Sequence, residues 1–223
     1  MKSSKYVVID PKKRNRYETY KRFNTFASST YGIDCEVDID EVVKFSKETK
    51  TSFFINFLYI VMISLTSIDE LRMRIEENEI RLYETIDPNF TVMSEAGTFD
   101  NCEFEMKDNY KDFYKEAHRV IEETKKEKTI KEGYNTSINH NQYYITCIPW
   151  CEFLSMSHPV PANDKISSSV PRICWCKYYL KNNRYNVVIN VTVDHTLVDG
   201  YPLSNAINAL KKNSTNCRDF FKN

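Results

Sequence analysis

The chain has 223 residues, of which 41% are hydrophobic and 28% charged, a balance typical of a globular protein with a substantial core. Its 31 basic and 31 acidic residues cancel, so no overall charge favours nucleic acid or an anionic membrane as a partner. The longest apolar run, residues 53–65, is too short to span a bilayer, and no signal peptide is evident, so we expect a cytoplasmic protein. Seven cysteines without a CxxC pair favour reduced, buried thiols.

Apolar periodicity predicts the elements of the first half of the chain. Asp10 precedes Pro11, the order expected at a helix N-terminus, and the basic helix that follows should present a solvated face. Residues 53–67 are apolar nearly all round and predict a buried helix. In chain order we expect a strand at 6–9, the basic helix at 12–26, a strand at 31–39, helices at 42–48, 53–67 and 69–75, and strands at 80–83 and 90–93.

The second half alternates in the same way. Gly133 is the expected cap of an amphipathic helix, and Pro149 stops the strand before it. In chain order we expect a helix at 113–131, a strand at 143–148, a loop at 155–169, an antiparallel hairpin of 172–180 with 185–193, a helix at 203–210 and a frayed polar tail at 213–223. No repeat or linker divides the chain, which predicts a single α/β domain over residues 1–212.

A run of β-branched residues ends at Asp194-His195, and Asp199-Gly200 follows four residues after the histidine. This order predicts a buried strand that places an imidazole at its end, with a tight turn behind it. Imidazole can accept a proton near neutral pH, so His195 is a candidate general base. Asp199 would either orient that imidazole or pair with a cation and fix the turn. A purely structural histidine is the alternative.

Other chemistries have less support in the sequence. The remaining histidines lack metal-ligand spacing, so no metal site is expected, and four glycines cannot build a phosphate-binding loop. Cys147 keeps Cys-His nucleophilic chemistry open, although its apolar neighbours would raise the pKa of a thiol. Thr146 ends a strand, where its hydroxyl would donate to an oxyanion or simply fill a half-buried position.

Several short motifs together resemble those of the chloramphenicol acetyltransferase family, in the same order and at matching spacings. They are Arg16-Tyr17-Glu18-Thr19-Tyr20, Asp69–Ile75, Asp87–Val92, Thr98-Phe99, Ile148-Pro149-Trp150, Cys176–Tyr179 and His195–Tyr201. The resemblance extends from about residue 6 to residue 212 and is more specific than the H-x-x-x-D-G pattern alone.

The resemblance implies an α/β fold, a two-layer sandwich with a mixed β-sheet of the CoA-dependent acyltransferase type. It also implies a homotrimer with active sites between subunits, acetyl-CoA as a co-substrate, no permanently bound cofactor and a small-molecule acceptor. In that family a histidine takes the proton of a chloramphenicol hydroxyl, which attacks the thioester directly, and a serine hydroxyl steadies the oxyanion. Antibiotic inactivation, without a nucleic-acid or membrane partner, is the function that it implies.

Catalytic residues carry over from the family position by position. His195 matches the general base, Thr146 falls on the serine position, and Asp199 matches a structural carboxylate. The arginine that usually pairs with this carboxylate aligns with Lys13, next to Arg14. A lysine there would keep the charge pair but not its two-point geometry.

Binding residues carry over in the same way. Tyr20 and Phe99 match aromatic residues of the acceptor pocket, whereas Trp150 and Tyr178 match residues near the coenzyme channel. The usual His-His pair of the family is Asp194-His195 in this chain.

Three further functions remain open. An Asp-His pair also occurs in the D-H-R-x-x-D-G motif of the acyltransferase core of 2-oxoacid dehydrogenases, but Thr196 replaces its arginine and no lipoyl domain is evident. A family-type enzyme with a different hydroxyl acceptor is the second possibility. The third is a ligand-binding homologue that has lost activity.

Overall fold

A mixed β-sheet organises the computed structural model, which describes residues 5–128, 140–161 and 164–222. Within these residues the sheet has seven strands in the order β2-β10-β8-β7-β5-β6, and β9 also pairs with β10. The strands are β2 (Thr30–Asp38), β5 (Asp87–Met93), β6 (Phe99–Glu103), β7 (Gln142–Ile148), β8 (Arg172–Cys176), β9 (Tyr179–Lys181) and β10 (Arg184–Asp194). Strand β7 is parallel to both β5 and β8, and the other pairs are antiparallel. The mixed sheet and its helices confirm the predicted α/β class.

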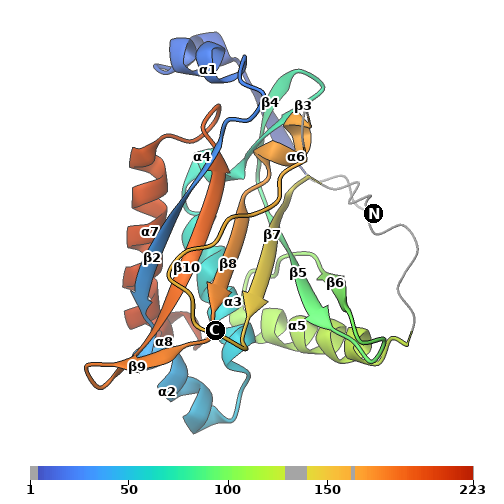
Figure 1. Ribbon diagram of the computed structural model, residues 1–223, viewed down its shortest axis with the longest axis vertical. Helices are drawn as coiled ribbons and strands as arrows, with labels where there is room; N and C mark the ends of the chain where they lie inside the picture. The colour runs from blue at the N-terminus through green and yellow to red at the C-terminus, as the bar shows by residue number, and fades with distance from the viewer. Residues whose placement is uncertain (1–4, 129–139, 162–163, 223) are drawn as a thin grey trace.

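A small antiparallel sheet, β1-β4-β3, lies beside the large one (Figure 1). Its strands are β1 (Tyr6–Ile9), β3 (Met73–Glu76) and β4 (Glu79–Tyr83). The turn from β3 to β4 is formed by Glu77 and Asn78, both with positive φ, as a two-residue hairpin requires. The predicted helix over 69–75 is therefore wrong beyond Arg72, because the next residues pair with β4.

Helices cover one face of the large sheet, so the architecture has two layers. The helices of the described residues are η1 (Pro11–Lys13, 3-10), α1 (Tyr17–Phe23), α2 (Asp40–Thr49), α3 (Phe53–Leu65), α4 (Asp69–Arg72), α5 (Tyr110–Lys125), α6 (Lys165–Ser169), α7 (Gly200–Thr215) and α8 (Cys217–Phe220), of which α2, α3, α5 and α7 form the layer on the large sheet. In Figure 1, α3 lies behind the central strands and α7 runs along β2. Helix α3 is buried around most of its surface, as its continuous apolar sequence predicts, and Ser52 caps its first turn.

Strand β10 is buried along nearly all of its length. Residues Val187 to Val193 have at most 9% of their surface exposed, because α3 and α7 cover one face. The connection from β7 to α6 reaches the other face, where the backbone N–H of Met156 donates to the carboxylate of Asp34. The strand that carries His195 is thus held on both sides, which fixes the position of its end.

Three more predicted elements differ from those in the structure, and one strand was not predicted. The basic helix expected over 12–26 is broken, because Arg14 has an extended backbone between η1 and α1. The helix expected over 113–131 begins at Tyr110 and ends at Lys125, and its proposed cap, Gly133, lies outside the described residues. Residues 165–169 of the expected loop form α6, and strand β6 was not predicted.

The frayed tail expected after residue 212 is not present in the structure. Helix α7 continues to Thr215, and α8 packs against α2. Phe221 has only 8% of its surface exposed and lies between Phe45 and Tyr110, with ring centroids 4.5 Å from each. The polar residues after Lys212 therefore form an ordered C-terminal segment that packs on the rest of the domain.

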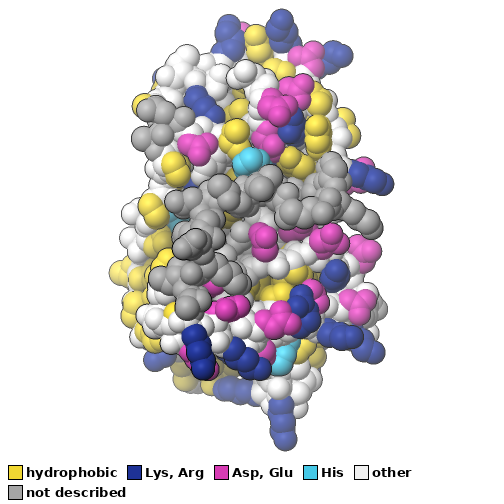
Figure 2. Space-filling model, turned by 90° about the vertical axis from the view of Figure 1, so that its right-hand side faces the viewer, with side chains coloured by type: hydrophobic (Ala, Val, Ile, Leu, Met, Phe, Trp, Pro, Cys, Tyr) yellow, Lys and Arg dark blue, Asp and Glu magenta, His cyan; other side chains and the backbone are white. Residues whose placement is uncertain are grey.

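No helix in the described ranges is long and apolar enough to cross a membrane. On the face shown in Figure 2, acidic and basic side chains are interspersed, which accords with the zero net charge. The described residues of that face form no continuous basic surface of the kind that binds nucleic acid.

Candidate active site

His195 directly follows the last residue of β10 and has a well-defined environment. Its backbone N–H donates to the carbonyl of Ser29 at 2.9 Å, next to the start of β2. Its imidazole stacks on Phe23 of α1, with ring centroids 4.0 Å apart and an interplanar angle of 11°, and also contacts Tyr31 at 4.7 Å. About a third of the side chain, 31%, remains exposed. The ring is therefore fixed in orientation and still reachable by a substrate.

Asp199 lies beside the imidazole. Its Oδ1 is 3.2 Å from Nδ1 of His195, a close polar contact that is not aligned as a hydrogen bond. A carboxylate on this side favours the tautomer with the proton on Nδ1. Nε2 then has a free lone pair, so this nitrogen is the one that can accept a proton from a substrate.

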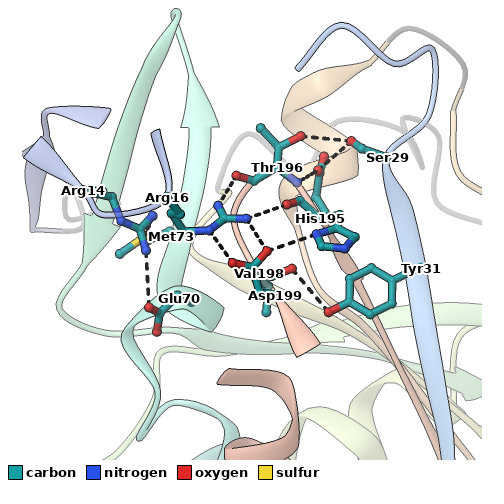
Figure 3. A network of polar contacts seen from close by, with 11 residues as sticks. Arg14, Arg16, Ser29, Tyr31, Glu70, Met73, His195, Thr196, Val198 and Asp199 are labelled. Carbon is teal, nitrogen blue, oxygen red and sulfur yellow. Dashed lines mark hydrogen bonds and ion pairs between the residues drawn. The ribbon is translucent and has the colours of Figure 1, made fainter. Parts of the chain in front are cut away.

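Arg16 joins these groups (Figure 3). Its Nε donates to Oδ2 of Asp199 at 2.8 Å and its Nη2 to Oδ1 at 2.6 Å, a two-point ion pair. The same guanidinium donates to the carbonyl oxygens of His195, at 2.8 Å, and of Thr196. One side chain from the N-terminus of α1 thus holds the whole turn between β10 and α7.

The prediction that Lys13 pairs with Asp199 is wrong. Lys13 is exposed, and the adjacent Arg14 donates to Glu70 at 3.3 Å instead. The extended backbone at Arg14 separates η1 from α1 and places Arg16 at the N-cap of α1, where it faces the turn. The arginine that pairs with Asp199 is therefore the first residue of the motif Arg16-Tyr17-Glu18-Thr19-Tyr20.

The ion pair between Arg16 and Asp199 also affects the pKa values of the site. Hydrogen bonds from Arg16 hold the pKa of Asp199 below its ordinary value, although burial acts in the opposite direction. Burial raises the pKa of Tyr31 to about 12, and the charge of Asp199 adds to this effect. Asp199 is therefore ionised and Tyr31 neutral at neutral pH, so a carboxylate and an uncharged phenol flank the imidazole.

Thr146 lies on β7, away from His195. It is half-buried and in register with Cys174 of β8, which in turn is in register with Asn190 of β10. His195 comes five residues after Asn190, so Thr146 and His195 are about 17 Å apart along the strands and about 10 Å across them, roughly 20 Å in all. Both cannot contact one reacting group within a single chain.

Trp150 and Tyr178 lie near the same ends of strands β7 and β8 as Thr146. Ile148 and Cys176 are paired at the ends of the parallel strands β7 and β8, and each aromatic residue follows two positions later. Trp150 is 67% exposed, while Tyr178 is half-buried against Phe53, with ring centroids 4.8 Å apart. Carboxyl ends of parallel strands are where α/β proteins commonly bind ligands.

The two acceptor-pocket residues expected from sequence lie on different elements. Tyr20 is half-buried on α1, the helix that also carries Phe23 to the imidazole. Phe99 begins β6 at the far edge of the large sheet and is 47% exposed. Within one chain, the structure brings Tyr20, His195 and Asp199 to one end and separates them from Phe99.

Alternative site chemistry finds little support in the geometry. No group of three or more His, Cys, Asp or Glu in the described part of the chain could hold a metal ion. Burial raises the pKa of Cys147 to about 12, so its thiol is protonated and weakly nucleophilic at neutral pH. The imidazole end of β10 is the better candidate for an active site.

Sequence reasoning missed Arg16, Phe23, Tyr31 and Ser29. Arg16 begins the motif Arg16–Tyr20. Its positive charge indicates a partner for Asp199 once the break in the helix at Arg14 is known. Phe23 and Tyr31 gave no local signal, because their contacts with His195 depend on how α1 and β2 are placed.

Comparison with known proteins identifies the family. The model of the family described as chloramphenicol acetyltransferase matches residues 4–211. The chain is 23% identical over 208 residues to a chloramphenicol acetyltransferase of Klebsiella sp, with 93% of each chain covered.

Solved structures share the fold. A chloramphenicol acetyltransferase structure has a TM-score of 0.84 at 23% identity and covers 93% of this chain and 99% of its own. The cubic core of the pyruvate dehydrogenase multienzyme complex has a TM-score of 0.63 at 11% identity, with 91% and 88% covered. The fold is thus that of the CoA-dependent acyltransferases, and this chain belongs to the chloramphenicol acetyltransferase family.

Proposed function

We propose that the protein transfers an acetyl group from acetyl-CoA to a hydroxyl of chloramphenicol, with His195 as general base. The observation that carries the proposal is the arrangement of His195, Asp199 and Arg16 in a chain of this family. A partly exposed imidazole, with a carboxylate beside Nδ1, is suited to remove a hydroxyl proton through Nε2. Acetylation would inactivate the antibiotic.

The reaction is a direct acyl transfer. Nε2 of His195 takes the hydroxyl proton as the hydroxyl oxygen attacks the thioester carbonyl carbon. The tetrahedral intermediate then collapses, the C–S bond breaks, and the proton passes from His195 to the coenzyme sulfur. Base catalysis of this kind contributes about 10²–10⁴-fold to the rate.

Thr146 is the proposed donor to the oxyanion. Thr146 lies near the same ends of strands β7 and β8 as Trp150 and Tyr178, the residues proposed to line the entry of acetyl-CoA. A single oxyanion donor contributes roughly 10²–10³-fold. Acetyl-CoA acts here as a co-substrate, and the proposal needs no permanently bound cofactor.

We further propose a homotrimer in which each active site lies between two subunits. Thr146 and His195 are roughly 20 Å apart in one chain, which is too far for one reacting group to contact both. This separation supports an active site shared between two subunits. A neighbouring subunit would supply Thr146, Trp150, Tyr178 and Phe99 opposite the His195, Asp199 and Tyr20 of the first. Each chain then contributes to two active sites.

A different hydroxyl acceptor is the second candidate. The specific reason is that Phe23 stacks on the imidazole, an aromatic contact beside the base that the sequence resemblance did not predict. All seven cysteines are free, which supports a reducing compartment, and we place the protein in the cytoplasm, where acetyl-CoA is available.

The experiment is an assay of free thiol released from acetyl-CoA in the presence of different acceptors. Chloramphenicol-dependent release by the wild type and its loss in His195→Ala, with unchanged oligomeric state, are expected. Release that depends on another hydroxyl compound would select the second candidate, and transfer to dihydrolipoamide would favour the 2-oxoacid dehydrogenase type. Silence with every acceptor would contradict enzymatic activity and favour a ligand-binding homologue.

A further inference from the structure

Asp194 is a buried carboxylate next to the proposed base, with 2% of its surface exposed. It precedes His195 at the end of β10, where successive side chains point to opposite faces of the sheet. Its Oδ1 accepts hydrogen bonds from the hydroxyl of Ser29 at 2.6 Å and from the backbone N–H of Thr196 at 2.7 Å. The carboxylate is therefore directed into the turn below the histidine and away from its ring.

The turn that carries both His195 and Asp199 closes on Asp194. The carbonyl of Asp194 accepts from the backbone N–H groups of Leu197, at 3.0 Å, and Val198, at 2.9 Å. Together with the bond from Thr196 to the carboxylate, three consecutive amides after His195 converge on this one residue. A side-chain oxygen that accepts from the amide two residues on forms an Asx turn, which fixes the backbone locally.

Ser29 completes the arrangement from the neighbouring strand. Its hydroxyl lies 3.0 Å from Oγ1 of Thr196 as well as 2.6 Å from Asp194, and its carbonyl accepts from the N–H of His195. Ser29 and Thr196 are both buried. Since Arg16 holds the carbonyl of His195, the peptide groups on both sides of the proposed base are fixed.

We infer that Asp194 is a positioning residue that sets the imidazole of His195 against Asp199 and Phe23 by closing the turn beneath it. The inference rests on the proposed role of His195 as general base. Its action is geometric: the carboxylate shapes the backbone that joins His195 to Asp199, while the ring itself contacts Phe23 and Tyr31. Asp194 thus has a defined task in this chain, where the family usually has a second histidine.

Asp194→Ala and Asp194→Asn separate this role from an effect of charge. Alanine removes both acceptor bonds of Oδ1, and we expect kcat to fall by about 10²-fold, as for a base displaced by about 1 Å, with the KM for acetyl-CoA nearly unchanged. Asparagine keeps Oδ1 and breaks no hydrogen bond, because Oδ2 has no hydrogen-bond partner among the described residues. Asp194→Asn should therefore retain most of the activity that Asp194→Ala loses.

Ser29→Ala is a second variant outside the turn, and it remains informative if Asp194→Ala does not fold. It removes one of the two donors to Oδ1, so we expect a smaller loss of kcat, about 10-fold. The matched control is Ser28→Ala, since Ser28 is exposed and bonds only to Thr30 in the described structure. It should leave both kcat and the melting temperature unchanged.

The position of the imidazole can be measured without turnover. The chain has four histidines, so ¹³C-labelled histidine gives four C2–H signals, and His195→Ala assigns that of His195. Stacking on Phe23 shifts this signal upfield through the ring current. We expect the shift to disappear in Asp194→Ala and to persist in Asp194→Asn and Ser28→Ala.

The outcomes distinguish the two proposals. If the wild type shows no acetyl transfer, the proposed function fails, while the NMR signal still tests the positioning role. An unchanged His195 signal in both Asp194→Ala and Ser29→Ala would overturn the positioning role. So would an Asp194→Asn variant as impaired as Asp194→Ala, because charge and not turn geometry would then be the cause.

Discussion

Arg16 and Asp199 form a two-point ion pair across 183 positions of sequence, with donor–acceptor distances of 2.8 and 2.6 Å. The pair joins the first helix to the start of α7 and holds the carboxylate beside the imidazole of His195. Because the same guanidinium also holds two carbonyl oxygens of the turn, its planar fork matters as much as its charge.

Arg16→Lys should therefore be damaging although it keeps the charge. A lysine cannot donate to both carboxylate oxygens and two carbonyls at once, so we expect kcat to fall about 10-fold or more and the melting temperature to drop. Steady-state kinetics and thermal unfolding measure the two effects. Lys13→Ala is the control, since Lys13 is exposed, and an equal loss there would restore Lys13 as the partner of Asp199.

The Asp199 ion pair should make stability depend on pH in a defined direction. The pKa of Asp199 is lowered in the folded protein, so its stabilising contribution is fully present above the unfolded value of about 3.9 and is lost as the pH falls through the folded value. Urea unfolding of the wild type and Asp199→Asn between pH 7 and pH 3 should show a gap in unfolding free energy that narrows below about pH 4. A gap that stays constant over this range would show that the carboxylate charge does not contribute.

Complementation between inactive variants tests the active site between subunits. His195→Ala and Thr146→Ala should each lose activity alone, but trimers mixed randomly from equal amounts should regain about a quarter of the wild-type sites. A site within one chain would give no recovery. Mixtures of either variant with itself, unfolded and refolded in the same way, are the control.

Cys147 should be dispensable. Its thiol has a pKa raised to about 12 by burial, so iodoacetamide at pH 8 should modify the exposed Cys151 first, as peptide mass spectrometry would show. Cys147→Ala should keep chloramphenicol-dependent thiol release within a few-fold of the wild type. Loss of turnover without loss of folding would instead support a cysteine nucleophile.

Phe221 should contribute to global stability. Its ring packs against Phe45 and Tyr110 with 8% of its surface exposed, so Phe221→Ala should cost about 3 kcal/mol of unfolding free energy. Denaturant unfolding measures this change. Lys222→Ala is the neighbouring control, because Lys222 is exposed, and its effect should stay within about 0.5 kcal/mol.

Periodicity predicted the parts of the fold whose burial is continuous. The β-branched run before His195 and the apolar sequence of α3 both gave the correct element, because burial on nearly all sides leaves a clear pattern. Strand β6 (Phe99–Glu103) escaped prediction because it contains Asp and Asn, which are poor strand formers, and its conformation depends on pairing with β5.

The candidate site was predictable only in its local part. His195 and Asp199 lie four residues apart, so their contact follows from the turn. The choice of Arg16 over Lys13 depended on a helix break at Arg14, and the stacking of Phe23 depended on the placement of α1. Both are tertiary effects that no spacing in the sequence records.

The C-terminal segment defines where this chain can be shortened. The family match ends at residue 211, yet Arg218 donates to Glu41 and Glu48, and Phe221 covers Phe45 and Tyr110. A chain cut at the family boundary would expose that aromatic surface and leave two acidic side chains of α2 without their arginine. Aggregation of such a truncated protein would then reflect the missing segment and not a failure of the acyltransferase fold.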